Sequence, residues 1–468
     1  MTVSSRRRFM QMASAVSLGF LGLRNYLLAG ESKSAESAGR MGFSPPVPDP
    51  WGLINLPKGF RYRVISKQGE RMSDGFLVPR LHDGMAAFPG PGDKVILVRN
   101  HEANNHPARD GPFGWNNELF PQVDRADVFD AGFGKKPVLG GTTTVVYDPG
   151  SGAVESHFLS LAGTARNCAG GLTPWNSWIS CEESVQSADE QYELDHGFNF
   201  EVPATTKIGL ADPRPLEAMG RFNHEAVAVD PRTGIVYQTE DRSDGLLYRF
   251  IPNEPGRLAK GGRLEALMIV QRPGLDMRNW PGAEESPHTP AVLVGQGLDV
   301  TWVSIENVLS PKDDLRQQGY SKGAAVFARG EGAWYGRESI YFACTSGGPK
   351  HAGQIWRYVP SPFEATGNEK RVPGRLELFL ESQDETVLEN ADNLTVAPWG
   401  DVIVCEDGPG QDRIIGITPE GQAYLIGENA ISDAEFAGLC FAPDGRTLFV
   451  NIQQVGITLA ITGPWMAS

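Results

Sequence analysis

The stretch EAVAVDPRTGIVYQTED (residues 225–241) holds two short runs of β-forming residues around a Pro–Gly turn signal, with carboxylates at both ends. Two such runs on either side of a tight turn are typical of a β-hairpin. Five further stretches of the chain follow the same pattern. They are NLTVAPWGDVIVCED (393–407), CAGGLTPWNSWISCEE (168–183), EGAWYGRESIYFACT (331–345), GLCFAPDGRTLFVN (438–451) and the looser GMAAFPGPGDKVILVRNHE (84–102).

Six hairpins of one kind favour a repeat architecture. Two more strands beside each hairpin would complete four-stranded blades, and residues 142–146 and 355–359 are candidates for such outer strands. We therefore predict an all-β fold, a six-bladed β-propeller in which residues 103–136, 184–203 and 253–290 are loop insertions. An ordinary β-sandwich is the alternative, but a sandwich does not need the same polar residues at the same place in every hairpin.

The composition indicates a globular chain with a large core. The 468 residues are 40% hydrophobic and 21% charged, and the formal net charge is −15. Such a balance does not fit a disordered chain. A strongly acidic protein is also a poor partner for nucleic acid or for an anionic membrane surface. Beyond the first 29 residues no run reaches the roughly 18 apolar residues of a membrane span, so we expect no stable membrane anchor.

The N-terminus is predicted to be an export signal. Residues 5–11, SRRRFMQ, resemble the twin-arginine pattern, and an apolar stretch interrupted by Arg24 follows them. We expect a cleaved signal peptide over residues 1–29, a flexible linker over 30–48 and one catalytic propeller over 49–468. The protein would then use the twin-arginine export machinery and act as a monomer, in the periplasm or secreted. A basic start before a core helix is the alternative.

Polar residues stand at matching places in the six hairpins. In a propeller the first strand of each hairpin lines the central channel, so its start and the end of the second strand meet at one rim. Residues at these positions are Asn100, Glu102, Cys168, Glu182, Glu183, Glu225, Glu240, Asp241, Glu331, Asn393, Glu406, Asp407 and Asn451. Two carboxylates about 4 Å apart repel by roughly 4 kcal/mol at an effective dielectric near 20. Either several of these groups hold protons or cations lie among them. A single Glu–Asp pair at a strand end is most often a solvated turn, but six coincident positions argue against that interpretation.

The residue types favour a metal site at one rim of the central channel. Carboxylate and amide oxygens are hard ligands that suit calcium. Cys168 stands in a polar, glycine-rich context, and its thiolate would be a softer ligand that suits a transition metal. Of the eight histidines only His101 and His224 lie near the predicted rim, which argues against a zinc site built from histidine.

Two arginines stand close to these candidate ligands. Arg329 lies two residues before Glu331, and strand alternation places both side chains on one face. Its guanidinium could bind an oxyanion held by the metals, or it could form a salt bridge with a neighbouring carboxylate. Arg166 stands in the same relation to Cys168.

Several of these segments together resemble the PhoX-type alkaline phosphatases. They are VRNHE (98–102), NCAGGLTPWNSWISCEE (167–183), GRFNHEAVAVD (220–230), YQTEDRSDGLLYRF (237–250), ARGEGAW (328–334) and DNLTVAPWGDVIVCEDG (392–408), and the matches span about residues 50–463. The chain departs from the family in being shorter than many members and in carrying Glu240–Asp241 where two aspartates are expected.

The resemblance implies a propeller whose iron–calcium cluster hydrolyses phosphate monoesters. It implies that Cys168 ligates iron, that Glu225 and Glu331 are cluster carboxylates, and that Arg329 contacts phosphate. We therefore take Glu225, Glu331 and Arg329 as the catalytic set. The predicted metal ligands are Glu102, Cys168, Glu182, Glu225, Glu331, Asn393 and Asp407.

Two other functions are compatible with the pattern. One is a calcium-dependent lactonase or sugar-ester hydrolase on a six-bladed propeller, which would need neither a thiolate nor iron. The other is an exported propeller without catalytic activity. A serine-nucleophile route is disfavoured because the sequence contains no G-x-S-x-G elbow.

Overall fold

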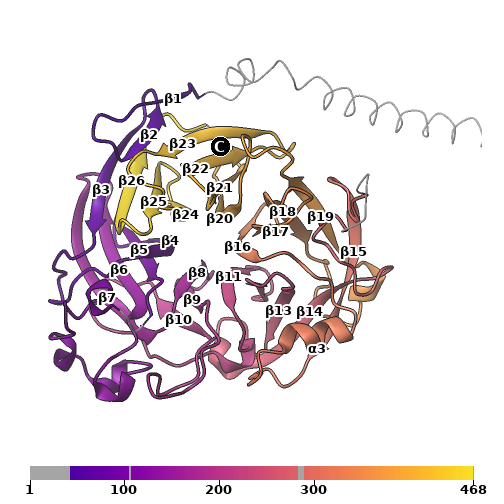
Figure 1. Cartoon of the computed structure of the whole chain (residues 1–468), viewed down its shortest axis with the longest axis horizontal. Coiled ribbons are helices and arrows are strands. Elements are labelled where there is room, and N and C mark those ends of the chain that lie inside the picture. The colour runs from indigo at the N-terminus through magenta and orange to yellow at the C-terminus, as the bar shows by residue number, and fades with distance from the viewer. Residues whose placement is uncertain (1–42, 105–106, 283–288, 467–468) are drawn as a thin grey trace, which may run out of the picture.

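The computed structural model describes residues 43–104, 107–282 and 289–466. In this part of the chain the elements are mostly strands, with one α-helix, α3 (Leu315–Ser321). The strands form five sheets placed in a ring around a common centre (Figure 1). None of the helices in the described ranges is long and apolar enough to cross a membrane. The predicted signal peptide and residues 30–42 of the predicted linker lie outside the described residues.

The strands follow the chain around the ring. The first sheet contains β4 (His82–Pro89), β5 (Val95–His101), β6 (Gly140–Asp148) and β7 (Ala153–Thr164), and the second contains β8 (Asn167–Leu172), β9 (Ser177–Glu182) and β10 (Asn199–Pro203). A nine-stranded sheet contains β11 (His224–Val229), β12 (Val236–Glu240), β13 (Leu247–Pro252), β14 (Gly262–Ile269), β15 (Gly297–Ile305), β19 (Gly374–Glu381), β18 (Gln354–Val359), β17 (Ser339–Cys344) and β16 (Gly330–Gly336).

The last two sheets combine strands from both ends of the chain. One contains β20 (Ala391–Val396), β21 (Val402–Glu406), β22 (Arg413–Ile417), β23 (Ala423–Asn429), β2 (Ile54–Pro57) and β1 (Pro46–Val47). The other contains β24 (Phe436–Phe441), β25 (Thr447–Ile452), β26 (Ile457–Thr462) and β3 (Arg61–Lys67). Short 3₁₀ turns lie at Ala108–Asp110, Phe120–Gln122, Arg125–Asp127, Gly132–Gly134, Glu217–Met219, Leu258–Lys260 and Glu369–Arg371.

All six predicted hairpins are antiparallel strand pairs. Their first strands β4, β8, β11, β16, β20 and β24 contact one another in this order, and β24 meets β4, so the ring closes (Figure 1). The all-β, propeller-like fold is therefore confirmed. Six separate blades are not seen, because β15 pairs with both β14 and β19 and joins two four-stranded units into one sheet.

Three predicted irregular segments contribute strands. β10 lies in the predicted insertion 184–203, β14 lies in the predicted insertion 253–290, and β1 falls inside the predicted linker 30–48. None of them belongs to the hairpin repeat, so the repeat did not reveal them. β3 completes the sheet of the C-terminal hairpin by pairing with β26, which ties the two ends of the chain together.

Trp334 of β16 contacts several units of the ring. Its partly buried side chain packs against three separate hydrophobic clusters. It also lines a small cavity of about 130 Å³ together with residues of β8 and β11. Trp334 thus bridges several units of the ring.

We expect Trp334→Ala to destabilise the ring, because it removes a large, partly buried side chain that contacts several units. Removal of a fully buried Trp typically costs about 3 kcal/mol or more, and the partly buried Trp334 should cost a substantial fraction of that. Denaturant unfolding should show this loss. Trp115→Ala, at a loop residue that is 70% exposed, should change stability by less than about 0.5 kcal/mol. Equal effects of the two substitutions would contradict the bridging role of Trp334.

A buried arginine joins the first sheet to the last. Arg99 of β5 is fully buried and forms no ion pair within the described ranges. Its guanidinium donates to Thr458 Oγ1 on β26 at 2.5 Å and to Thr143 Oγ1 on β6 at 2.9 Å, and it lies 3.4 Å from His157 Nε2. The hydrogen-bond partners of this cation are neutral groups, at the junction where the ring closes.

The histidines around Arg99 must stay neutral. His82 Nδ1 lies 3.1 Å from Thr458 Oγ1, and His101 Nε2 lies 2.9 Å from Thr143 Oγ1. Burial and the charge of Arg99 lower the pKa of His82, His101 and His157 well below the usual range. Protonation of any of them would place a second buried cation beside the first.

Acid should therefore weaken this junction. The unfolded chain takes up protons at these histidines near pH 6.5 and the folded protein does not, so stability falls as the pH drops below that value. His157→Gln keeps an acceptor for Arg99 and cannot be charged. We expect the variant to lose less stability than the wild type between pH 7 and pH 5. The difference between the two free energies of unfolding should change by up to about 1.4 kcal/mol per pH unit. Parallel stability curves for the two proteins in denaturant titrations would refute this account.

Candidate metal centre

A β-bulge recurs at the same place in all six first strands. In each hairpin the pairing with the second strand skips two residues of the first strand, as between His82 and Met85 or between His224 and Val227. A bulge bends its strand and redirects a side chain. The first bulged residues are Asp83, Cys168, Glu225, Glu331, Asp392 and Gly438. Five of the six positions thus aim an acidic group or a thiol at the rim.

A second set of acids follows the second strands. Glu102, Glu183 and Asp407 come directly after the strand residue that pairs across from the start of the first strand. Glu435 precedes β24, whose own bulge carries a glycine. We call the resulting cluster the acidic pool. It consists of Asp83, Glu102, Cys168, Glu183, Glu225, Glu331, Asp392, Asp407 and Glu435.

The ligand atoms of the pool form four overlapping groups. Within each group these atoms all lie within 4.8 Å of one another. The groups are Cys168–Glu183–Glu225, Glu225–Glu331–Asp392, Asp392–Asp407–Glu435 and Asp83–Glu102–Glu435. Because neighbouring groups share Glu225, Asp392 or Glu435, the pool is one continuous cluster of eight carboxyl groups and a thiol.

The pool cannot be fully ionised without compensating charge. Burial and repulsion between neighbours raise the pKa of Glu225, Glu331 and Glu435 well above the usual range, and that of Glu183 to about 9. The same causes raise the pKa of Asp392 to about 7. Without cations, much of the cluster therefore holds protons at neutral pH.

Cys168 is the soft member of the cluster. Its buried thiol lies 2.8 Å from Glu225 Oε2, to which it donates, and burial with the neighbouring carboxylates raises its pKa far above the usual range. A metal ion in this position would replace the shared proton, since thiolate and carboxylate both bind metals in their ionised forms.

Two arginines border the pool. Arg166 donates to Glu102 at 2.7 Å and to Glu183 at 2.5 Å. Arg329 donates to both oxygens of Asp241 at 2.8 and 2.9 Å, and its Nη2 lies 3.1 Å from Glu331 Oε1. The salt-bridge alternative for Arg329 is thus present in the structure, and it leaves the guanidinium partly exposed.

The structure brings five of the predicted metal ligands together and leaves two out. Glu102, Cys168, Glu225, Glu331 and Asp407 belong to the pool. The other two, Glu182 and Asn393, are the neighbours in sequence of pool members.

Glu182 is a structural carboxylate. Its two oxygens accept backbone N–H groups of Ala165, Gly197 and Phe198, and Oε1 lies 2.6 Å from His196 Nδ1. Burial lowers the pKa of His196, but the carboxylates of Glu182 and Asp130 outweigh this and raise it to about 9. With its oxygens already bonded inside the insertion loops, Glu182 lies outside the pool, and Glu183 occupies the place expected for it.

Asn393 borders the pool. Its Oδ1 accepts the backbone N–H of Gly438 at 3.0 Å, which ties β20 to the bulge of β24, and its side chain is also hydrogen-bonded to Asp392. Asp392, one residue earlier, is the bulged residue that reaches the rim.

Four pool members were not predicted as metal ligands from the sequence. They are Asp83, Glu183, Asp392 and Glu435. Simple alternation cannot decide which residue of a two-residue bulge faces the axis, and this explains Asp392. A comparison of the hairpins could have identified Asp392 and Glu183. Cys168 stands as far before Glu183 in the sequence as Asp392 stands before Asp407. Glu435 lies before its hairpin and carries no such signal.

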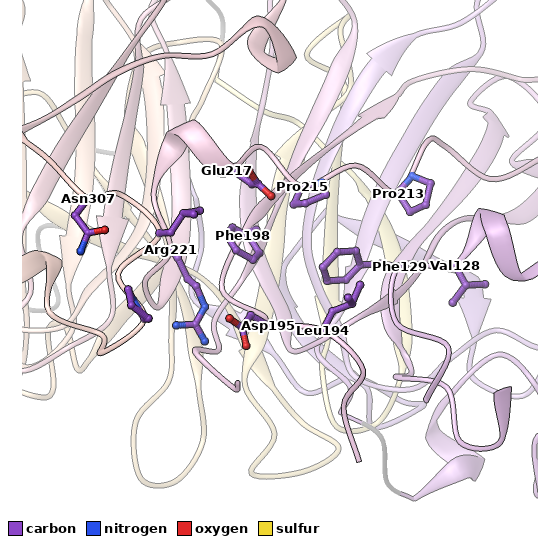
Figure 2. A pocket seen from close by; sticks show the side chains of 12 residues that line it. Val128, Phe129, Leu194, Asp195, Phe198, Pro213, Pro215, Glu217, Arg221 and Asn307 are labelled. Carbon is purple, nitrogen blue, oxygen red and sulfur yellow. The ribbon is translucent and has the colours of Figure 1, made fainter. Parts of the chain in front are cut away.

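A larger cavity lies apart from the pool. It has a volume of about 680 Å³ and mostly apolar walls, among them Phe129, Leu194, Phe198 and Pro215 (Figure 2). Arg221 borders it and donates to the backbone carbonyls of residues 185, 186 and 310. None of the pool members that the structure describes lines this cavity, which lies among the insertion loops behind Glu182.

The donor set of the pool fits metal ions of two kinds. Groups made only of carboxylates are typical of hard cations such as calcium. The group with a thiol suits a transition metal. Such ions would replace the protons of the pool and reduce the repulsion between its carboxylates.

Comparisons with known proteins give a family match and solved structures of similar fold. A family model described as alkaline phosphatase PhoX matches residues 41–456. Among solved structures, Pseudomonas fluorescens PhoX in complex with vanadate, a transition-state analogue, has a TM-score of 0.63 at 17% identity and covers 90% of this chain and 98% of that chain. A gluconolactonase from Xanthomonas campestris has a TM-score of only 0.38 at 12% identity, with 90% and 98% covered. The comparison with curated proteins gives no match.

Metal binding should expel protons from the pool. We expect calcium added to chelator-treated protein at pH 7 to release protons, because the carboxyl groups with raised pKa must ionise to bind it. Release should decline toward pH 9, where Glu183 is already ionising. Calorimetry in two buffers of different ionisation enthalpy measures this quantity, and Glu331→Gln should release fewer protons. Binding heats that do not depend on the buffer at pH 7 would count against a protonated pool.

Proposed function

The chain belongs to the PhoX family of alkaline phosphatases, and from this premise we propose that it hydrolyses phosphate monoesters at the acidic pool. It is a phosphatase of the PhoX type and acts on small-molecule phosphate substrates. The observation that carries the proposed location is the convergence of eight carboxyl groups and a thiol on one rim of the ring.

We assign the metals from the chemistry of the donors. Iron would be held by the group that contains Cys168, with Glu183 and Glu225, and calcium by the groups made only of carboxylates. Bound there, the metals would polarise the phosphoryl group and lower the pKa of water. They would also offset the negative field of the pool, which otherwise repels a phosphate ester.

The protein supplies orientation and charge. Asp241 fixes Arg329 through Nε and Nη2, and this leaves Nη1 available to donate to a phosphate oxygen. Such charge-assisted hydrogen bonds stabilise the charge that develops on the phosphoryl oxygens. Glu225 and Glu331 would hold the reacting group in place through the metals that they ligate.

Several finer statements belong to the same proposal. Dividing the nine-stranded sheet at β15 gives six blades, each with one bulged first strand. Residues 49–468 would form the catalytic unit. The twin-arginine pattern in residues 5–11 supports export by the twin-arginine machinery, a periplasmic or secreted location and cleavage of residues 1–29. We propose a monomer.

Substitution of Glu225 tests the site. Glu225 belongs to two of the four ligand groups, so Glu225→Gln should disturb metals on both sides of it. Loss of an outer hydrogen-bond partner of a metal ligand commonly costs 10–100-fold, and we expect at least about 100-fold here. The assay is turnover of a generic phosphomonoester together with metal content. Glu428→Gln, on outer strand β23, is the control, and unchanged turnover with unchanged metals in Glu225→Gln would contradict the proposal.

Substitution of Cys168 separates the phosphatase from the rival functions. Cys168→Ser should lower the iron content and the activity while most of the calcium remains, because serine is a poor ligand for iron at neutral pH. A calcium-dependent lactonase would keep its metals and hydrolyse a sugar lactone. An inactive binding module would show no hydrolysis of either ester by the wild-type protein.

A further inference from the structure

Arg166 and Arg329 occupy equivalent places on two sides of β11. Each stands two residues before the first bulged residue of its strand, Cys168 in one case and Glu331 in the other. Both have a positive φ, 49° and 52°, which is unusual for arginine. Their side chains are 38% and 44% exposed. The repeat therefore presents one guanidinium at each side of the Glu225 position.

Both guanidiniums are held in place by carboxylates. Arg166 uses Nε and Nη2 to bind Glu102 and Glu183, and Arg329 uses the same two atoms to bind Asp241. The Glu183 and Asp241 side chains are hydrogen-bonded to each other. Arg166, Glu183, Asp241 and Arg329 thus form one network across the rim, and within the described ranges neither Nη1 has a protein acceptor.

These arginines are the cations that act on the pool. Arg166 opposes the rise in the pKa of Glu183, and Arg329 opposes those of Glu331 and Asp392. An incoming phosphate ester would meet these partly exposed guanidiniums beside many carboxylates. Guanidiniums that are already fixed lose little conformational freedom on binding an anion.

We propose that Arg166 is a second phosphate-binding residue, and that Arg166 and Arg329 together select the dianion of a phosphate monoester over the monoanion of a diester. This inference rests on the proposed function of the acidic pool. A monoester offers three terminal oxygens and two negative charges, whereas a diester offers two oxygens and one charge. Two guanidiniums on opposite sides of Glu225 match the first pattern better than the second.

Arg166→Gln tests the inference, assayed with p-nitrophenyl phosphate and bis-p-nitrophenyl phosphate at saturating iron and calcium. Loss of a hydrogen bond from a charged donor corresponds to about 10–100-fold. We expect kcat/KM to fall by that factor for the monoester and by less than about 3-fold for the diester. The inhibition constant of inorganic phosphate should rise in parallel with the monoester effect. Arg232→Gln is the control, because it breaks a similarly exposed ion pair with Asp230 at the other end of β11. It should change neither the ratio of the kcat/KM values for the two esters nor the inhibition constant of inorganic phosphate.

An equal fall for both esters, with the phosphate inhibition constant unchanged, would overturn the inference and leave Arg166 as a support for Glu102 and Glu183. If Arg166→Gln loses metals, Arg166→Lys keeps the positive charge near both carboxylates. It should retain the metals and show a partial loss of monoester preference, and an unchanged preference or renewed metal loss would overturn the inference. Failure of the wild-type protein to hydrolyse either ester would instead refute the proposed function.

Discussion

Repulsion among buried acids is the constraint on which the site depends. Eight carboxyl groups and a thiol meet on one rim, and burial with mutual repulsion raises the pKa of most of them. A fold selected for stability alone would not gather these groups, because each buried charge without a partner costs free energy. Cations that neutralise the cluster would give the arrangement a physical reason, and the same cations would supply the chemistry of a phosphatase.

The repeated bulge is the device that builds the cluster. The sequence predicted the six hairpins, the ring and the rim at which their polar ends meet, because alternation and turn residues are local signals. It predicted Cys168, Glu225, Glu331, Glu102 and Asp407 correctly as neighbours. It named Asn393 rather than Asp392 as a ligand, because a bulge breaks the alternation from which side-chain direction is inferred. It placed both Glu182 and Glu183 at the rim but named Glu182 as the ligand, whereas Glu182 is bonded to backbone N–H groups and to His196. The nine-stranded sheet could not be predicted from local sequence patterns either. It forms because β15 pairs with β14 on one side and with β19, which is distant in sequence, on the other.

Two features accompany the cluster. Trp334 contacts several units of the ring. Arg166 and Arg329 are partly exposed and anchored by carboxylates that belong to the pool or lie next to it. A phosphate ester that reaches the pool would therefore meet positive charge as well as exposed acids such as Asp407. The buried Arg99 network and the pairing of β3 with β26 hold the ring closed around this site.

Anomalous X-ray diffraction from crystals of protein purified without chelator tests the central claim most directly. The account predicts anomalous density between the side chains of Cys168, Glu183 and Glu225 that peaks at the iron absorption edge, with further cations among the groups made only of carboxylates. A well-ordered pool that contains only water, in protein that hydrolyses phosphate monoesters, would contradict the claim that bound metal ions hold these acids together.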